Sequence, residues 1–127
     1  LEFRRVLFRS NVHWERILSD ILEQIPKNES FSYRVFNCGV MDLGDAVQVT
    51  PKTLNILEGS YSTHPELIGR YDLKIFLKTS PETQSARILK RNGPARHKMF
   101  VEKWIPLENL YFTSYPVEKQ CDLVFTT

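Results

Sequence analysis

The sequence contains little cysteine and no long apolar run. Cys38 and Cys121 are the two cysteines among 127 residues, and neither belongs to a Cys-x-x-Cys spacing. A disulfide framework or a zinc site therefore has no support, and a reducing cytoplasm is the expected location. No stretch approaches the roughly 20 uninterrupted apolar residues that a membrane helix needs, so no membrane partner is expected.

A strong charge of one sign is also absent. The chain has 17 basic and 15 acidic residues, and the first ten residues hold three arginines and one glutamate. The rest of the chain is therefore balanced, with 14 residues of each sign. Because nucleic-acid binding draws on an excess of positive charge, this balance argues against a nucleic acid partner. A content of 42% hydrophobic and 12% aromatic residues favours a globular fold over disorder.

Residues 1–10, LEFRRVLFRS, match neither a signal peptide nor a transit peptide. The string resembles the in-frame translation of a short-read sequencing adapter, and we expect it to be non-native. The alternative is a genuine basic amphipathic start. On the first interpretation the native chain begins upstream of Asn11, and residues 11–127 are one portion of a larger domain.

Periodicity predicts the first elements of that domain. Apolar residues recur at helical spacing over 11–25, which predicts a helix that ends near Pro26. Alternating residues over 31–35 predict a strand, and the glycines within 38–45 predict a loop. The chain can then return as a second short strand over 46–50, which gives a hairpin-like arm.

Apolar runs and helices alternate in the rest of the chain. The runs at 54–57 and 73–77 predict buried strands, and 122–125 predicts a third strand. Ser80-Pro81-Glu82 is typical of a helix start, and that helix should end at Asn92-Gly93. A second helical stretch follows from 94 to 111, with a kink or break at Pro106. This alternation favours the α/β class, as one domain built on an open, mostly parallel sheet from which N-terminal strands are missing.

Glu58 directly follows the apolar run at 54–57. Ligands of open α/β sheets bind at the carboxyl ends of the strands, where a carboxylate can hold Mg²⁺ directly or through water. An equally simple interpretation is that Glu58 caps the turn that follows it.

Basic residues gather around the predicted helix end at Gly93-Pro94: Arg87, Lys90, Arg91 and Arg96. Arg87 and Arg91 are four residues apart and share a helical face, so they can clamp a phosphate with their guanidinium groups. A solvated helix face, with cations near a helix C-terminus, is the alternative, and this pattern alone favours it.

Six stretches carry a family pattern through their order and spacing: Asn11-Val12-His13-Trp14-Glu15-Arg16, Phe31-Ser32-Tyr33-Arg34, Leu57-Glu58-Gly59-Ser60-Tyr61-Ser62, Tyr71-Asp72-Leu73-Lys74-Ile75-Phe76-Leu77, Arg87-Ile88-Leu89-Lys90-Arg91-Asn92-Gly93 and Trp104-Ile105-Pro106-Leu107-Glu108. Together they resemble the C-terminal two thirds of a uridine kinase-like P-loop kinase, within the phosphoribulokinase and uridine kinase group. The resemblance covers essentially everything from Asn11 onward.

This resemblance implies ATP-dependent phosphorylation of a hydroxyl, typically the 5′-hydroxyl of uridine or cytidine, on a doubly wound sheet with a mobile lid. Glu58 would serve Mg²⁺. Arg87 and Arg91 would be catalytic lid cations that, with Arg96, bind the transferred phosphate. Seven residues would line the acceptor site: Asn11, His13, Arg16, Tyr33, Arg34, Tyr61 and His64.

The chain also departs from the family pattern. The phosphate-binding Gly-x-x-x-x-Gly-Lys-Ser/Thr and the aspartate pair are absent, so we expect this polypeptide alone to be inactive. His13 replaces a family aspartate, and Val35-Phe36-Asn37 replaces Pro-Tyr-Asp, which leaves open another small hydroxyl compound as the acceptor. The alternative function is a non-catalytic α/β binding module whose basic cluster docks an acidic partner. A homo-oligomer also stays open.

Overall fold

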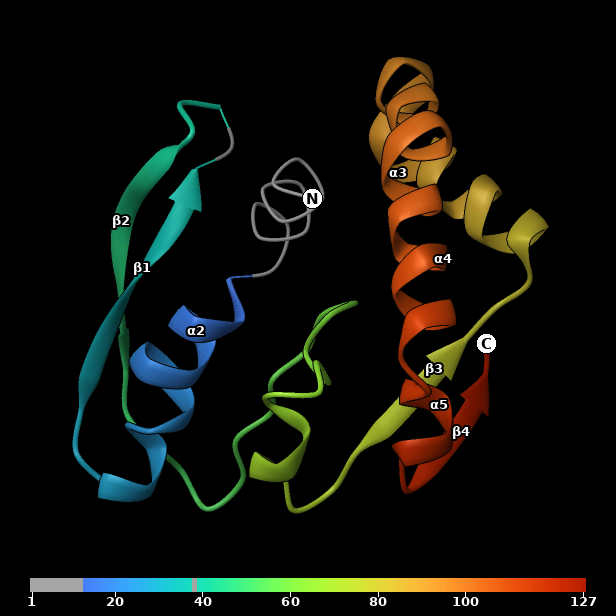
Figure 1. The fold of residues 1–127 in the computed structure, drawn as a ribbon. Helices are drawn as coiled ribbons and strands as arrows, with labels where there is room; N and C mark the ends of the chain where they lie inside the picture. Colours follow the sequence, from blue (N-terminus) through green and yellow to red (C-terminus); the bar gives the residue numbers. More distant parts are fainter. Residues whose placement is uncertain (1–12, 38) are drawn as a thin grey trace. The chain divides into compact units, whose positions relative to one another are not determined.

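The computed structural model describes residues 13–37 and 39–127, and the chain divides into two compact units, Leu1–Ser62 and Thr63–Thr127 (Figure 1). Each unit combines helices with one two-stranded sheet, so the predicted mixed α/β class is confirmed at this level. The sheet of the first unit is antiparallel, and that of the second unit is parallel. No helix in the described ranges is both long and apolar enough to cross a membrane.

The first unit opens with a helical segment whose geometry changes along its length. The α-helix α2 (Trp14–Ile17) continues as the π-helix η1 (Leu18–Leu22), and the 3₁₀ helix η2 (Ile25–Lys27) follows. Asn28 then adopts a left-handed conformation with φ 55°, which ends the segment. The helix predicted over 11–25 is therefore confirmed from Trp14 onward, although its start lies outside the described residues.

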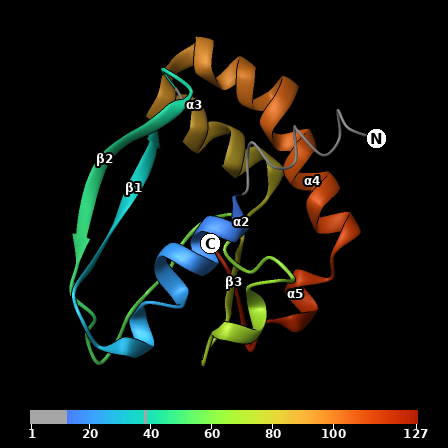
Figure 2. The same cartoon turned by 60° about the vertical axis from the view of Figure 1, so that its left-hand side comes forward.

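A β-hairpin forms the arm of this unit (Figures 1 and 2). Strand β1 (Phe31–Asn37) pairs antiparallel with β2 (Asp42–Val49), and the register shifts between Arg34 and Phe36. The arm is thus confirmed, but the loop prediction is wrong for residues 42–45, which belong to β2. Local composition favoured a loop there, whereas pairing with the end of β1 supplies the backbone hydrogen bonds and a bulge absorbs the extra residue.

The strand predicted at 54–57 does not form among the described residues. Leu54 and Ile56 are 74% and 82% exposed, so the expected burial is also wrong. The Asn55 side chain explains the local geometry, because it accepts a hydrogen bond from the Lys52 backbone N–H (3.0 Å) and donates one to the Lys52 carbonyl (2.7 Å). Such side-chain bonds compete with a strand ladder and close a loop instead.

The second unit has a β-α-β arrangement. Strands β3 (Ile75–Lys78) and β4 (Leu123–Thr126) pair in parallel, with Ile75 opposite Leu123. The short helix η3 (Ile68–Arg70) precedes β3. The connection between the strands contains four helical elements: α3 (Pro81–Met99), η4 (Phe100–Trp104), α4 (Ile105–Ser114) and α5 (Val117–Gln120). Both strand predictions are confirmed in position, but the burial expected for 73–77 is wrong, since Leu73, Ile75 and Leu77 are exposed.

Helix α3 begins where the sequence predicts, and at Gly93, where the sequence predicts its end, the helix is interrupted by a bend and then continues to Met99. The Ser80 hydroxyl caps its start by accepting a hydrogen bond from the Thr83 N–H at 3.1 Å. Gly93 interrupts the helix with φ 79° and ψ 171°, and Pro94 follows. Farther on, the π-helix η4 passes directly into α4, which carries Pro106 in its first turn. Trp104 and Ile105 keep right-handed helical φ and ψ at this junction, so the helix changes type before the proline but is not broken there.

The core of the second unit is small and aromatic. Its buried side chains are Leu67, Ile88, Tyr111, Val117 and His64. The His64 ring stacks on Tyr111 at 6.3 Å between centroids, and Tyr115 meets Tyr111 edge-on at 5.4 Å. Phe112 of α4 meets Phe76 of β3 edge-on at 5.4 Å, and this contact ties the helix to one face of the sheet.

The start of β4 is tied to β3 by a carboxylate, which makes the unit sensitive to acid. Asp122 accepts a hydrogen bond from the Lys74 backbone N–H at 2.7 Å, and this bond lowers the pKa of the carboxyl group below its usual value. A depressed folded-state pKa contributes stability above the unfolded-state pKa, near 4, that is lost as the pH falls through the folded-state pKa. Asp122→Asn should therefore lower the melting temperature at neutral pH. Below about pH 5, the melting temperature of this variant should fall less steeply than that of the wild type. Thermal melts between neutral and acidic pH test this, and Asp72→Asn, at an exposed carboxylate, should leave the profile unchanged.

Candidate functional site

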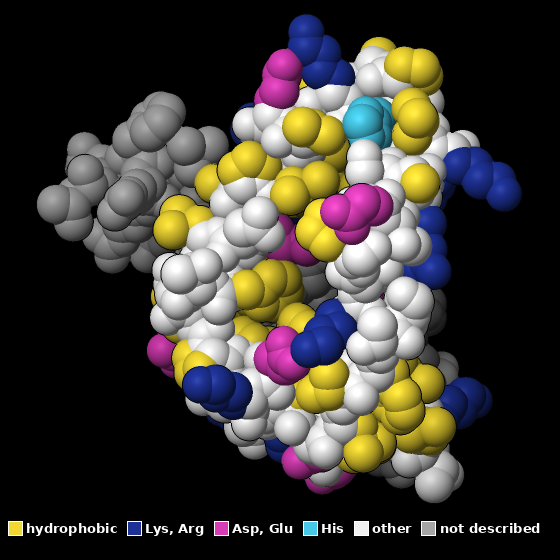
Figure 3. Space-filling view, turned by 90° about the vertical axis from the view of Figure 1, so that its right-hand side faces the viewer, with side chains coloured by type: hydrophobic (Ala, Val, Ile, Leu, Met, Phe, Trp, Pro, Cys, Tyr) yellow, Lys and Arg dark blue, Asp and Glu magenta, His cyan; other side chains and the backbone are white. Residues whose placement is uncertain are grey.

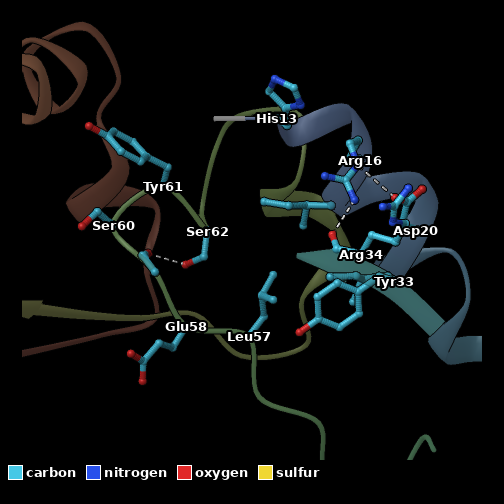
Figure 4. Close-up of a pocket in the computed structure, with 13 residues that line it drawn as sticks. His13, Arg16, Asp20, Tyr33, Arg34, Leu57, Glu58, Ser60, Tyr61 and Ser62 are labelled. Carbon is cyan, nitrogen blue, oxygen red and sulfur yellow. Dashed lines mark hydrogen bonds and ion pairs between the residues drawn. The ribbon is translucent and has the colours of Figure 1, made fainter. Parts of the chain in front are cut away.

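The first unit contains a cavity of about 280 Å³ between its helical segment, strand β1 and the loop that follows residue 56 (Figure 4). This volume lies just below the range of about 300–1,000 Å³ that is typical of small-molecule sites. Five residues that the family resemblance assigns to an acceptor site line the cavity, together with the predicted metal ligand: His13, Arg16, Tyr33, Arg34, Tyr61 and Glu58. These residues come from three separate segments of the chain.

Hydrogen bonds hold the two arginines of the cavity. Arg16 lies in α2 and donates through Nε to Asp20 Oδ2 at 3.2 Å and through Nη2 to the Arg34 carbonyl at 2.7 Å. The Arg34 guanidinium donates to the carbonyls of Leu43 (2.7 Å) and Gly44 (2.9 Å) on strand β2. Arg34 thus spans the irregular register of the hairpin, and Arg16 joins the hairpin to the helix. Both guanidinium groups are hydrogen-bonded within the unit, so these side chains hold the cavity wall in place in addition to offering charge to a ligand.

The remaining wall is aromatic and apolar. The Tyr33 ring projects from β1 toward the loop around Leu57, whereas Tyr61 leaves that loop in the opposite direction (Figure 4). Ile17 and Ile21 add apolar surface from the helical segment. At the start of α2, the His13 ring lies 6.1 Å from Phe36. A flat ring with polar substituents suits this combination of surfaces.

Glu58 is exposed, and its carboxylate is directed away from Arg16 and Arg34 (Figure 4). Since residues 54–57 form no strand, Glu58 does not stand at a strand end as the sequence argument supposed. The part of the chain that the structure describes contains no group of three or more His, Cys, Asp or Glu residues that could hold a metal ion. Glu58 therefore fits Mg²⁺ only as a single carboxylate, for an ion that takes its other ligands from water and phosphate.

The predicted phosphate-binding arginines lie in the second unit, on α3. Arg87 donates to the Thr127 hydroxyl at 3.1 Å, just beyond β4, and Arg91 donates to Asn92 Oδ1 at 2.9 Å. Arg96 follows the bend at Gly93 and is exposed. Arg87 thus stands at the carboxyl edge of the parallel strands, where ligands of α/β sheets bind.

Two other predicted site residues have different positions. His64 lies in the second unit, where it is buried and accepts a hydrogen bond from the Glu66 N–H through Nδ1 at 3.2 Å. Its contacts are those of a core histidine. Asn11 lies outside the described residues.

Some lining residues were missed by the sequence reasoning, namely Asp20, Ser60 and Ser62. Asp20 could have been found, because it follows Arg16 by four residues, the spacing at which opposite charges meet on a helix. The Ser62 hydroxyl donates to the Gly59 carbonyl at 2.8 Å and closes the turn that brings both serines to the cavity. No sequence pattern predicts that turn.

The bend in α3 separates Arg91 from Arg96, and Gly93 makes it possible. Its φ and ψ fall in a region that is essentially restricted to glycine. Across the bend, Ser85 and His97 lie within hydrogen-bond distance, at 2.7 Å between Oγ and Nε2. This bond links the two segments of the helix.

Gly93→Ala should destabilise the second unit by about 1–3 kcal/mol, because alanine is strained in this conformation. Chemical denaturation of the two proteins measures the difference. Gly69→Ala is the matched control, since Gly69 has an ordinary φ and open space where the alanine methyl group would lie. Equal costs for the two variants would contradict a bend fixed by Gly93.

Comparison with known proteins adds no evidence to the geometry of the site. No protein-family model matches the chain, and a search of curated proteins finds no significant match.

Proposed function

We propose that the chain is part of an ATP-dependent small-molecule kinase of the uridine kinase-like group, and that the cavity of the first unit binds the hydroxyl-bearing acceptor. One observation supports this most directly: residues assigned to the acceptor site by resemblance, and distant in sequence, line one cavity. They come from α2, β1 and the loop after residue 56. The proposed acceptor is a nucleoside such as uridine or cytidine.

The chemistry of the cavity supports an acceptor of this type. A nucleoside has a flat, partly apolar base and a sugar rich in hydroxyl groups. The Tyr33 ring and the apolar side chains of Ile17 and Leu57 offer surface to the base. Asp20 and the serine hydroxyls offer hydrogen-bond partners to a sugar.

ATP and Mg²⁺ belong to the same proposal. Arg87 and Arg91 would bind the transferred phosphate and stabilise its charge, with Arg96 beside them, and Glu58 would supply one carboxylate to the ion. Nucleotide phosphates also need a phosphate loop, and the attacking hydroxyl needs a carboxylate base. Gene sequence read upstream from the Asn11 codon is expected to encode both. An upstream sequence that encodes neither would contradict the kinase assignment.

Ligand titration tests the acceptor site on this polypeptide. Uridine or cytidine should shift the NMR signals of residues that line the cavity, and Tyr33→Ala should weaken the binding about tenfold through loss of ring contact. Tyr33→Phe keeps the ring and should retain most of the affinity. Leu110→Ala changes an exposed residue of the second unit and serves as the control. Nucleoside binding that is indifferent to Tyr33→Ala would overturn the assignment of this cavity.

A further inference from the structure

Asn92 precedes Gly93 at the bend of α3, and it is the one asparagine of the sequence that a glycine follows. In an Asn-Gly pair the backbone nitrogen of the glycine can attack the amide carbon of the asparagine side chain, since no Cβ of the second residue hinders the approach. The other asparagines are followed by larger residues: Asn11, Asn28, Asn37, Asn55 and Asn109. The sequence therefore singles out Asn92 for loss of its side-chain amide.

The helix is weakened at the point where this reaction has to occur. Gly93 has φ 79° and ψ 171°, and a Cβ added there would meet no other atom within 4 Å, so space is open beside this residue. Pro94 has no N–H group, so the Lys90 carbonyl lacks the donor that an unbroken helix would supply. The last turn before the bend should therefore open at a lower free-energy cost than the interior of α3.

A guanidinium group lies against the side chain that would react. Arg91 donates through Nε to Asn92 Oδ1 at 2.9 Å. When the glycine nitrogen attacks the amide carbon, negative charge develops on this same oxygen. A cation that donates a hydrogen bond to the oxygen lowers the barrier, as the donors of an oxyanion hole do.

The surroundings of Asn92 are polar and open to solvent. Lys90 and Arg91 are exposed, and lysine and arginine side chains project outward at the margins of the face in Figure 3. Asn92 itself is partly exposed. The water that completes a hydrolysis can therefore reach its side chain.

One bond opposes the opening of the bend. Ser85 Oγ and His97 Nε2 lie 2.7 Å apart and hold together the two segments of α3, between which the chain reverses direction (Figure 2). The Gly93 nitrogen reaches the Asn92 side chain only when the backbone at Asn92 leaves its helical conformation. The bond between Ser85 and His97 restrains that movement, so it should slow the reaction.

We propose that Asn92 is a site of spontaneous deamidation and that Arg91 promotes the reaction. The Gly93 nitrogen forms a bond to Cγ of Asn92, the Cγ–Nδ2 bond breaks, and the proton of the Gly93 amide leaves with Nδ2 as ammonia. Water then opens the cyclic imide at either carbonyl and gives aspartate or isoaspartate, and no oxidant or reductant takes part. Both products carry a carboxylate beside Arg91. Isoaspartate also adds a carbon to the backbone at the bend.

Deamidation changes the segment that the proposed function places against the transferred phosphate. The new carboxylate lowers the net positive charge of the group formed by Arg87, Lys90, Arg91 and Arg96. The longer backbone of isoaspartate shifts the residues that follow the bend, including His97. The reaction itself requires no ligand, so it can be tested separately from the kinase proposal.

Peptide mass spectrometry of the full chain, incubated at mildly alkaline pH, measures the reaction at each asparagine. Asn92 should lose its amide at least about tenfold faster than Asn55 or Asn109, which corresponds to about 1.4 kcal/mol in activation free energy. An isoaspartate methyltransferase should label the product at position 92. The same chain unfolded in urea is the control for detection. An Asn92 that reacts in urea but stays intact in the folded chain would overturn the proposal.

Three variants test the neighbouring side chains. Arg91→Met should slow the deamidation about fivefold, because the developing oxyanion loses its charged donor. Lys90→Met is the matched control, since it removes the same charge from the adjacent position but keeps the bond to Asn92, and it should change the rate little. Ser85→Ala should accelerate the reaction about threefold by releasing the bend. Equal rates in Arg91→Met and Lys90→Met would contradict the role of Arg91.

Discussion

Tyr111→Ala is expected to unfold the second unit or leave it only marginally stable. Tyr111 has no exposed surface, and its ring contacts His64, Phe112 and Tyr115. Removing a large buried ring costs about 3–5 kcal/mol through lost burial and the cavity that remains. A unit of this size is stabilised by only about 3–10 kcal/mol, so the loss is a large fraction of the total.

Thermal unfolding followed by near-ultraviolet circular dichroism measures this effect, since the packed tyrosines contribute to that signal. Leu110→Ala is the matched control, because Leu110 adjoins Tyr111 in α4 but is exposed. It should change the melting temperature little. A Tyr111→Ala protein that melts with wild-type cooperativity and midpoint would show that the aromatic cluster is not the centre of this unit.

The elements that sequence reasoning predicted well are those with local signals. The helix start at Ser80 rests on a hydroxyl that caps its own helix, and the bend at Gly93 rests on a conformation that glycine alone adopts readily. Strand β1 follows from alternation over 31–35. Each of these signals acts within a few residues, so it does not depend on how the rest of the chain folds.

The predictions that failed depend on partners that the local sequence does not specify. The run at 54–57 is apolar enough for a buried strand, yet Asn55 bonds to the backbone of Lys52 and no strand pairs with the segment in the described ranges. Asp42 and the following residues have turn-like composition, yet pairing with β1 makes them a strand. A strand is specified by its neighbour as much as by its own residues.

The candidate site shows the same difference between features that the sequence predicts and features that depend on contacts with distant residues. Family resemblance selected residues that do line one cavity, but it did not indicate how they are held. Arg34 illustrates this, since its guanidinium is bound to carbonyls of β2 across a register shift. No periodicity in the sequence marks that shift. His64 shows the converse, because its identity suggests chemistry while its burial beside Tyr111 and Tyr115 makes it part of the core.

The largest expected effect concerns phosphoryl transfer. The 127-residue polypeptide should transfer no phosphate from ATP to uridine, cytidine or another nucleoside above the uncatalysed background, even with Mg²⁺ in excess. Catalysis of this reaction consists almost entirely of positioning and electrostatic stabilisation. The sequence contains no Gly-x-x-x-x-Gly-Lys-Ser/Thr to hold the nucleotide phosphates. Arginines on α3 and a single carboxylate at Glu58 cannot replace that cradle, so the loss should be complete rather than partial.

Transfer of radiolabelled γ-phosphate measures this directly, and a known nucleoside kinase is the positive control. On the proposed function, a longer protein that also carries a phosphate loop should show transfer that exceeds the background by at least about 10⁶-fold, the lower end of typical enzymatic accelerations. In that protein Arg87→Ala should lower kcat more than it raises KM, because the proposed role of Arg87, to face the transferred phosphate, acts mainly on the transition state. Phosphorylation by the 127-residue chain itself would mean that its own residues bind the nucleotide phosphates. That result would contradict the proposal that a separate phosphate loop binds them.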